Sequence, residues 1–320
     1  MAEWVPSGGA ASSSSSSSPP WAPRVRGAPG RWRVFTGNEV GALLAAWRWR
    51  RYLEDAPGGP LGEAARSGAY RSAAFFSAST VSSKFLKRMA AVEGFTYQET
   101  LTGFKWMGNA MAAAEAPAEG GEAGGGKTPL FAFEEAIGYA CCGAVRDKDG
   151  VSAAALFGEM AGVLAGEGRS ALGELEALYG RYGGFVSNNG YLVCRKPEVT
   201  EAIFGRLICE GRYWARAGPL GITGVRDLRA PGWDSANAGF EGERRGAPSL
   251  PLSSGSNMLT YTFSNGVVAT LRSSGTEPKL KWYAEGPSEA AVDATVDVIL
   301  DEMLQPEKNG LARPPRLVRG

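Results

Sequence analysis

A pair of β-forming runs around residue 265 constrains the fold more than any other feature of the chain. Residues 258–264 and 267–272 are rich in β-branched and aromatic side chains, and Asn265-Gly266 separates them. Two such runs around Asn-Gly predict a β-hairpin with a type I′ turn. Residues 279–285 read as a third strand. The C-terminal part of the chain is therefore expected to contain an antiparallel sheet.

The loop that follows this hairpin has the chemistry of a phosphate-binding site. An arginine fork matches phosphate oxygens, hydroxyls add neutral donors, and glycine permits φ > 0 and close backbone approach. Lys279 and Lys281 are expected to keep the local field positive. A plain polar turn is the alternative, but a loop between two strands is rigid enough to hold a dianion. The predicted phosphate-binding residues are Arg272, Ser273, Ser274, Gly275, Thr276 and Lys281.

Composition excludes several classes of function. A mass of 33.6 kDa suggests two domains, and a net charge of +1 gives no reason to expect nucleic acid or an anionic membrane. No run approaches the roughly 18 apolar residues of a membrane span. The four cysteines have neither metal-ligand nor disulfide spacing, which fits a reducing, cytoplasmic location. Histidine is absent, which removes Ser-His-Asp catalysis and histidine-bound metals.

The chain divides by composition into several segments. Residues 1–30 are rich in serine and proline and are expected to be a disordered leader. Strands alternate with helices over residues 31–190, which predicts an α/β domain. Residues 110–126, nearly all Ala, Gly and Glu, are expected to form a flexible low-complexity insertion. Residues 191–315 are predicted to form a smaller α+β domain, and residues 316–320 a tail.

Helix starts are marked by local capping patterns. Thr36-Gly-Asn-Glu39 is a capping box, and Ser288 reads as an N-cap behind Pro287. The apolar residues of the first helix are expected on one face: Val40, Leu43, Leu44 and Trp47. Further helices are predicted at 81–92, 151–165, 170–182 and 197–210, and strands at 73–77, 130–133 and 190–194.

Three further stretches contain candidate ligand-binding groups. Residues 102–106 combine a turn, a cation and two rings, and Glu134-Glu135 directly follow a buried strand. Carboxylates at the end of such a strand can accept hydrogen bonds from vicinal hydroxyls. Residues 147–150 form a charged turn before a helix. Singly, each has a duller explanation: a core aromatic turn, a solvated helix cap and a surface loop.

Taken together and in this order, these motifs resemble the α-D-phosphohexomutase superfamily, and within it the phosphoglucomutase-2 (phosphopentomutase) subgroup. The resemblance covers nearly everything from Arg31 to about Leu311. The resembling segments are 34–41, 80–84, 99–109, 130–139, 147–153, 225–228 and 272–285.

The resemblance implies a fold and a set of roles. Residues 31–190 resemble the third, sugar-binding domain of the family, a mixed sheet with helices on both faces. Residues 191–315 resemble the fourth, phosphate-binding domain, an antiparallel sheet similar to the TATA-box-binding protein. Glu135 would bind the sugar 3- and 4-hydroxyls, and the phosphate loop would hold the phosphate that is not transferred. The implied sugar-binding residues are Lys84, Thr102, Gly103, Lys105, Glu134 and Glu135.

The implied activity is that of a phosphoglucomutase/phosphopentomutase, an intramolecular phosphotransferase of carbohydrate metabolism. It would convert sugar 1-phosphates to 5- or 6-phosphates. The implied partners are ribose, deoxyribose or glucose phosphates, bound by a monomer. Two features of the family are missing, however. The chain has neither the phosphoserine loop nor the Asp-x-Asp-x-Asp-Arg loop that holds Mg²⁺.

We therefore assign no catalytic and no metal-binding residue. Mg²⁺ and a sugar bisphosphate activator are expected only for a full-length member, and the chain by itself is predicted to be inactive. A truncated gene model and a splice form would both produce this pattern. One alternative is a glucose-1,6-bisphosphate synthase-type relative, which residues 304–311 favour, whereas Thr102 and Ala136 favour the phosphopentomutase type. The other alternative is an inactive sugar-phosphate-binding fragment.

Overall fold

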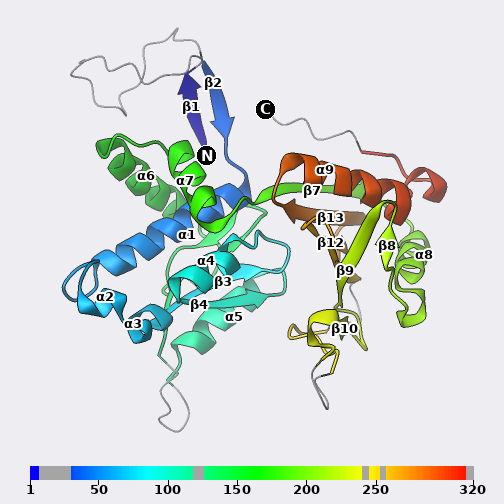
Figure 1. The fold of residues 1–320 in the computed structure, drawn as a ribbon, viewed down its shortest axis with the longest axis horizontal. Helices are drawn as coiled ribbons and strands as arrows, with labels where there is room; N and C mark the ends of the chain where they lie inside the picture. The colour runs from blue at the N-terminus through cyan, green and yellow to red at the C-terminus, as the bar shows by residue number, and fades with distance from the viewer. Residues whose placement is uncertain (7–29, 118–125, 240–244, 253–256, 315–320) are drawn as a thin grey trace. The chain divides into compact units, whose positions relative to one another are not determined.

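The computed structural model describes residues 1–6, 30–117, 126–239, 245–252 and 257–314, and Figure 1 labels most of its helices and strands. The chain divides into two compact units, Met1–Gly183 and Gly184–Arg319. The expected boundary between residues 190 and 191 falls inside strand β7 (Val186–Val193). Strand β7 pairs along its whole length with β13 (Lys279–Gly286). Backbone hydrogen bonds therefore place residues 186–190 in the second unit.

The first unit contains a four-stranded mixed sheet in the order β4-β3-β5-β6. Strand β3 (Ala74–Ser79) runs parallel to β4 (Thr96–Thr100) and to β5 (Thr128–Glu134). Strand β6 (Gly138–Ala140) returns antiparallel to β5. The alternation of strands and helices thus predicted a parallel arrangement and the strands β3 and β5, but no strand was predicted at β4.

Helices cover both faces of this sheet. Phe76, whose ring lies 6.4 Å from that of Trp49, faces helix α1 (Gly37–Glu54). The neighbouring Phe75 faces the other way and packs with the apolar residues of α5 (Phe104–Glu115). Successive strand residues point to opposite faces, so both faces of β3 are buried. The mixed sheet with helices on both faces is therefore confirmed.

The remaining helices of the first unit are α2 (Glu63–Arg66), α3 (Gly68–Ala73), α4 (Phe85–Glu93), α6 (Gly150–Gly166) and α7 (Ala171–Tyr182). Helix α4 starts four residues later than predicted, because residues 80–84 form a turn. Within the part of the chain that the structure describes, no helix is long and apolar enough to cross a bilayer.

The capping box at the start of α1 is confirmed. The Thr36 side chain accepts from the Glu39 backbone N–H, and the Glu39 carboxylate accepts from the Thr36 backbone N–H at 2.7 Å. All four apolar residues predicted for the inward face are buried: Val40, Leu43, Leu44 and Trp47. The capping box thus stabilises the start of this helix, and burial in the core stabilises its apolar face.

Two predictions of irregular structure need correction. Ala2–Pro6 forms strand β1, which pairs antiparallel with β2 (Gly30–Val34), so these residues are not part of a disordered leader. Residues 7–29 lie outside the described residues. Helix α5 continues through Glu115, because alanine favours helix and Met111 is fully buried. Within the predicted insertion at 110–126, residues 116, 117 and 126 are not helical. Residues 118–125 lie outside the described residues.

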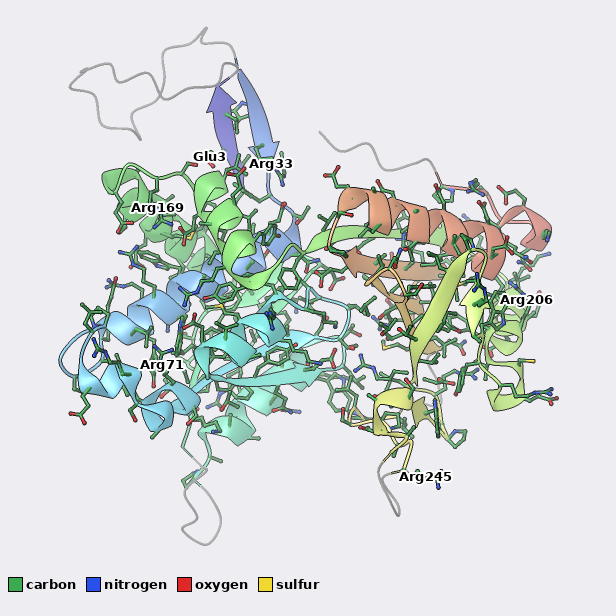
Figure 2. The ribbon with its side chains drawn as sticks, viewed as in Figure 1. Glu3, Arg33, Arg71, Arg169, Arg206 and Arg245 are labelled. Atoms are coloured by element: carbon green, nitrogen blue, oxygen red, sulfur yellow. The ribbon has the colours of Figure 1, made fainter. Side chains whose placement is uncertain are left out.

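A buried carboxylate ties together the helices of the first unit. Glu93, whose side chain is 5% exposed, accepts hydrogen bonds from Trp49 Nε1 at 3.1 Å and from the Tyr182 hydroxyl at 2.6 Å. It also forms ion pairs with Arg71, labelled in Figure 2, and with Arg181. Four side chains from the three helices α1, α3 and α7 therefore satisfy one buried charge.

The second unit is built on a seven-stranded antiparallel sheet in the order β10-β9-β11-β12-β13-β7, with β8 paired to β9. Its other strands are β8 (Arg216–Ala217), β9 (Leu220–Asp227), β10 (Trp233–Asp234), β11 (Met258–Phe263) and β12 (Val268–Ser273). The antiparallel sheet is confirmed. The likeness to the TATA-box-binding protein stays a prediction.

The turn of the β11–β12 hairpin differs from the predicted type I′. Gly266 donates to the Phe263 carbonyl at 3.0 Å, and Phe263 donates to the Val267 carbonyl at 2.8 Å. The loop therefore holds three residues, and within it only Gly266 has a positive φ, of 82°. This is a type I turn followed by a glycine bulge, the alternative that Asn-Gly also permits.

Helices α8 (Pro197–Ile208) and α9 (Glu289–Val298), with a π-helical turn at Ile299–Leu304, pack their apolar residues against this sheet. The Ser288 side chain accepts from the Ala291 backbone N–H, so the predicted N-cap is confirmed. Tyr261 and Phe204 are fully buried in this core. The sheet therefore offers a fixed support for the loop between β12 and β13.

Candidate functional site

Three loops meet at the carboxyl ends of the parallel strands β3, β4 and β5. The Gly103 backbone N–H, after β4, donates to Glu134 Oε1 at 2.6 Å. The Glu135 backbone N–H, after β5, donates to the hydroxyl of Ser82, after β3, at 3.0 Å. Parallel strands place their carboxyl ends along one edge of a sheet, where open α/β sheets bind ligands. The structure thus joins the predicted sugar-binding segments of all three loops.

Lys84 lies at the N-terminus of α4, and its ammonium is held in place. Its Nζ donates to the Thr80 carbonyl at 2.7 Å and to Glu99 Oε1 at 2.9 Å. The Thr80 hydroxyl donates to the same Glu99 oxygen at 2.9 Å. The lysine side chain keeps 25% of its surface exposed. Lys84 is therefore a positioned cation, and Glu99 is a residue of this site that sequence reasoning missed.

The two adjacent glutamates are used differently. Glu134 ends β5, and its carboxylate fixes the turn at Gly103, whose φ of 109° favours glycine. Glu135 begins the following loop, and the Ser82 hydroxyl lies 3.5 Å from its Oε2. Ser82 therefore holds the Glu135 loop through both its backbone and its side chain.

The Glu135 loop lies directly against the start of α1. A Cβ added to Gly37 would lie 1.9 Å from the Glu135 carbonyl oxygen, so only glycine allows this approach. The Tyr139 hydroxyl donates to the Gly37 carbonyl at 3.0 Å. Burial raises the pKa of Tyr139, which keeps this hydroxyl protonated. The first turn of α1 thus sets the position of the loop.

Within the same loop, Ile137 has an unusual backbone conformation. Its φ is 57° although it is β-branched, and 74% of its surface is exposed. A β-branched residue in the left-handed region is strained, and its exposed side chain gains little from packing. Strain of this kind often accompanies ligand-binding loops.

Thr102 and Lys105 flank the Gly103 turn. Thr102 is half-buried and Lys105 is exposed, with its Nζ 5.7 Å from the centre of the Trp106 ring. Their role in sugar binding stays a prediction.

The predicted phosphate loop connects β12 to β13. The Ser273 hydroxyl accepts from the Asn257 backbone N–H at 3.1 Å, and the Ser274 hydroxyl accepts from the Glu277 backbone N–H at 3.3 Å. Gly275 has no positive φ, and no described atom lies within 4 Å of where its Cβ would be. The expected conformational need for glycine is thus wrong here, and Gly275 instead leaves open space beside the exposed Thr276.

The charge of this loop is also different from the expected one. Glu277 pairs with Lys279 at 2.7 Å and with Lys281 at 3.4 Å, so the two lysines do not simply add positive field. These contacts lower the pKa of Glu277. Arg272 pairs in register with Lys281, and its Nε is buried without a hydrogen-bond partner among the described residues. An unsatisfied buried donor suits an anion-binding site.

A pocket of about 220 Å³ lies beside the loop. Of the predicted residues, Ser273 and Ser274 line it, and the other four are not among its lining residues. Sequence reasoning missed its second wall, which comes from the β7–α8 connection and the first turn of α8. The residues of that wall are Cys194, Arg195, Pro197, Thr200 and Glu201. A distant segment carries no local signal of such a contact.

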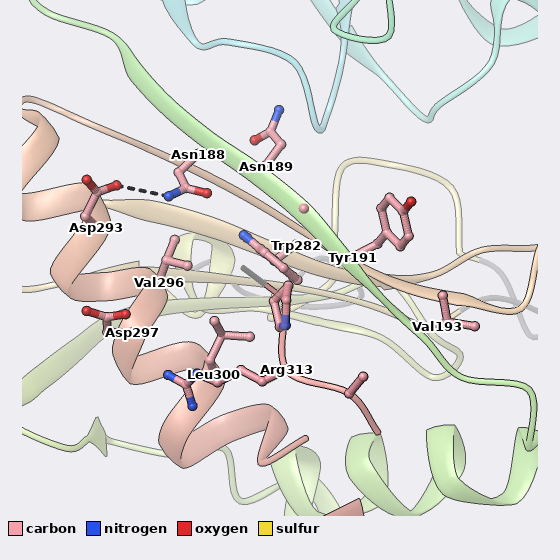
Figure 3. A pocket seen from close by; sticks show the side chains of 13 residues that line it. Asn188, Asn189, Tyr191, Val193, Trp282, Asp293, Val296, Asp297, Leu300 and Arg313 are labelled. Carbon is pink, nitrogen blue, oxygen red and sulfur yellow. Dashed lines mark hydrogen bonds between the residues drawn. The ribbon is translucent and has the colours of Figure 1, made fainter. Parts of the chain in front are cut away.

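Another pocket, of about 550 Å³, lies between β7, β13 and α9 (Figure 3). Asn188 donates to Asp293 at 3.0 Å at one side, and Trp282 forms part of the wall. The added Cβ of Gly190 would meet the Trp282 ring at 2.1 Å, so glycine is required for this packing. None of the predicted sugar- or phosphate-binding residues lines this pocket.

The described residues contain no cluster of three or more His, Cys, Asp or Glu side chains that could hold a metal ion.

Comparisons with known proteins agree with this geometry. Residues 37–182 match the family model for phosphoglucomutase/phosphomannomutase, alpha/beta/alpha domain III. Residues 234–302 match the model for the phosphoglucomutase/phosphomannomutase C-terminal domain. The first match contains all the predicted sugar-binding residues, and the second contains the phosphate loop.

Curated relatives match over most of the chain. The chain is 40% identical to the phosphopentomutase of Mus musculus over 298 residues, covering 88% of this chain and 44% of the relative. It is 38% identical to the mouse glucose 1,6-bisphosphate synthase over 295 residues, with the same coverage of 88% and 44%. A probable phosphoribomutase of Schizosaccharomyces pombe is 36% identical, covering 89% of this chain and 46% of the relative. The chain thus spans less than half the length of these relatives.

Among solved structures, pp63/parafusin (phosphoglucomutase) from Paramecium shares the fold, with a TM-score of 0.54 and 15% sequence identity, covering 88% of this chain and 43% of that one. The chain belongs to the phosphoglucomutase/phosphomannomutase family, of which it contains domain III and the C-terminal domain.

Proposed function

We propose that this chain is the sugar-phosphate-binding half of a phosphopentomutase-type intramolecular phosphotransferase. The observation that carries the proposal is the junction of three loops at the carboxyl edge of β3, β4 and β5. There, the carboxylate loop at Glu134-Glu135 is hydrogen-bonded to the turns at Ser82 and Gly103. Carboxylates held at such an edge suit the hydroxyls of a sugar. The 40% identity to a phosphopentomutase supports the same substrate class.

In this proposal each set of residues has a separate task. Glu135 accepts hydrogen bonds from sugar hydroxyls, while Lys84 and Lys105 lie against the ring or its substituents. Arg272 and the hydroxyls of the phosphate loop hold the phosphate that is not transferred. All these contacts are non-covalent. The same residues could therefore bind a bisphosphorylated sugar in either of its two orientations.

The relatives include both a phosphopentomutase and a glucose 1,6-bisphosphate synthase, at 40% and 38% identity. Identity alone therefore does not choose between the two activities. Thr102 and Ala136 lie in the site loops and favour the phosphopentomutase type, whereas residues 304–311, which favour the synthase type, belong to the second unit. We propose the phosphopentomutase type on this ground.

The chain alone is proposed to bind without turnover. Phosphoryl transfer depends on positioning and on neutralising charge on the phosphoryl oxygens. The serine and aspartate loops that the family resemblance implies for this step do not occur in the 320 residues. Mg²⁺ and a bisphosphate activator would accordingly belong to a full-length member.

Calorimetric titration with ribose 5-phosphate, ribose and inorganic phosphate tests the proposal. We expect ribose 5-phosphate to bind at least tenfold more tightly than ribose. We expect Glu135→Gln and Arg272→Ala each to weaken it about tenfold, because charged hydrogen bonds are lost. Lys281→Ala is the matched control for the loop and should lose less than Arg272→Ala, since Glu277 already neutralises Lys281.

Thermal melts of each variant separate loss of binding from loss of folding. Equal affinity for ribose and ribose 5-phosphate, or equal losses for Arg272→Ala and Lys281→Ala, would count against the proposed site. A coupled assay with ribose 1-phosphate and a bisphosphate activator should show no turnover, and turnover comparable to that of a full-length relative would refute the binding-half assignment.

A further inference from the structure

The pocket beside the phosphate loop has two walls that come from distant parts of the sequence. One wall is the loop itself, with Ser273, Ser274 and Lys279. The other is the connection between β7 and α8, which contains Arg195 and leads into Pro197 at the start of the helix. Arg195 therefore lies in the lining of a pocket whose opposite wall carries the proposed phosphate ligands.

The charged side chains that line this pocket are not equally available to a ligand. Glu277 pairs with Lys279, and the Glu201 carboxylate accepts from Asn257 Nδ2 at 2.7 Å. Arg195 is exposed and forms no hydrogen bond or ion pair with any described residue. Among the described side chains that line the pocket, it is thus the cation whose charge no neighbouring carboxylate neutralises.

The hydroxyls on the other wall complete a donor set. Ser273 and Ser274 each accept a backbone N–H, and a hydroxyl that accepts one hydrogen bond still has its own proton to donate. A guanidinium offers a planar fork of donors that matches two phosphate oxygens. Donors from both walls would therefore surround a phosphomonoester dianion placed in the pocket.

We propose that Arg195 is a further phosphate ligand, which approaches the phosphate of a bound sugar phosphate from the β7–α8 side. The inference deepens the proposed function and rests on it. It adds a phosphate-binding residue outside the loop. Arg195 would bind the anion first, while Glu277 is still ion-paired with Lys279 and Lys281.

The test compares Arg195→Gln with Arg212→Gln in the intact chain. Arg212 is exposed like Arg195 and lies beyond the other end of the 12-residue helix α8, roughly 18 Å away along the helix. Both variants remove one positive charge from the second unit. Because neither arginine side chain forms a hydrogen bond or ion pair with a described residue, both variants should melt at the temperature of the unmodified chain.

Titrations use ribose 5-phosphate and inorganic phosphate at pH 8, where the phosphomonoester is dianionic. We expect Arg195→Gln to weaken ribose 5-phosphate binding about tenfold, Arg195→Lys to weaken it less, and Arg212→Gln to stay within about twofold. An equal effect of Arg195→Gln and Arg212→Gln, with the unmodified chain binding normally, would overturn the role of Arg195 alone. Absence of ribose 5-phosphate binding by the unmodified chain would instead refute the proposed function, and the inference with it.

Discussion

Replacing Gly37 with alanine tests how the first turn of α1 positions the Glu135 loop. The new Cβ would lie 1.9 Å from the Glu135 carbonyl oxygen and 2.8 Å from its carbonyl carbon. Real Cβ atoms essentially never come closer than 3.0 Å, so the two segments must separate by at least about 1.1 Å. Both contacts are with backbone, so no side-chain rotation relieves them.

Neither segment can move without cost. Helix α1 is held by its capping box and its buried face, and the loop is held by Ser82. Overpacking of this kind lowers the free energy of unfolding by about 1–3 kcal/mol, and we expect a loss near the upper end of this range. The melting temperature of the first unit should then fall by roughly 5–10 °C. Displacement of Glu135 should also weaken ribose 5-phosphate binding at least tenfold.

Gly158→Ala is the matched control. It makes the same chemical change inside helix α6, where no atom lies within 4 Å of the new Cβ. Alanine there should stabilise the unit by about 0.5–1 kcal/mol, because it favours helix over glycine. Helix propensity alone would predict the same gain in stability at Gly37. Because of the backbone clash, we instead expect Gly37→Ala to lower the free energy of unfolding and Gly158→Ala to raise it. A Gly37→Ala chain that is as stable as the unmodified chain, with unchanged affinity, would refute the reasoning.

Four further predictions concern strain, a buried charge and the cysteine thiols. Ile137→Gly should raise its stability by about 0.5–1 kcal/mol in denaturant titrations, because it relieves a positive φ at an exposed side chain; a loss of stability would show that the strain is absent. Glu93→Ala should cost about 3–5 kcal/mol by leaving buried donors unpaired, whereas the exposed Glu159→Ala should change stability by less than about 1 kcal/mol; similar losses would contradict the buried hub. Burial raises the pKa of Cys141 to about 11, so at pH 8 maleimide should label the exposed Cys209 well before Cys141, as peptide mass spectrometry can verify. As pH rises from about 9 through about 11, the stability that the neutral Cys141 thiol contributes should be lost, and Cys141→Ala should flatten that part of the pH profile.

Much of the fold could be predicted from local sequence patterns. The capping box at Thr36, the N-cap at Ser288 and the hairpin around Asn265-Gly266 each depend on a few contiguous residues. The hairpin was correct but its turn was not, because Asn-Gly fits both a two-residue loop and a three-residue loop with a glycine bulge. The strand at Ala2–Pro6 was missed because its partner lies beyond the serine-rich run.

The candidate site was predictable in its residue types and less so in its contacts. The sequence places Glu134 after a buried strand, but not the hydrogen bond that commits its carboxylate to Gly103. It places two lysines after the phosphate loop, but not the pairing of both with Glu277. Such contacts depend on side-chain directions that only the packed backbone sets.

By itself, the sequence determined several helices and strands, the antiparallel sheet and the likeness to the family, because these follow from periodicity, capping and motifs along the chain. Only the tertiary structure decided that Gly37 meets the Glu135 loop and that Arg195 lines the pocket beside Ser273. The first pair is separated by 98 residues and the second by 78, as their numbers show. Contacts at such separations follow from how strands register and helices pack, and no local pattern encodes them.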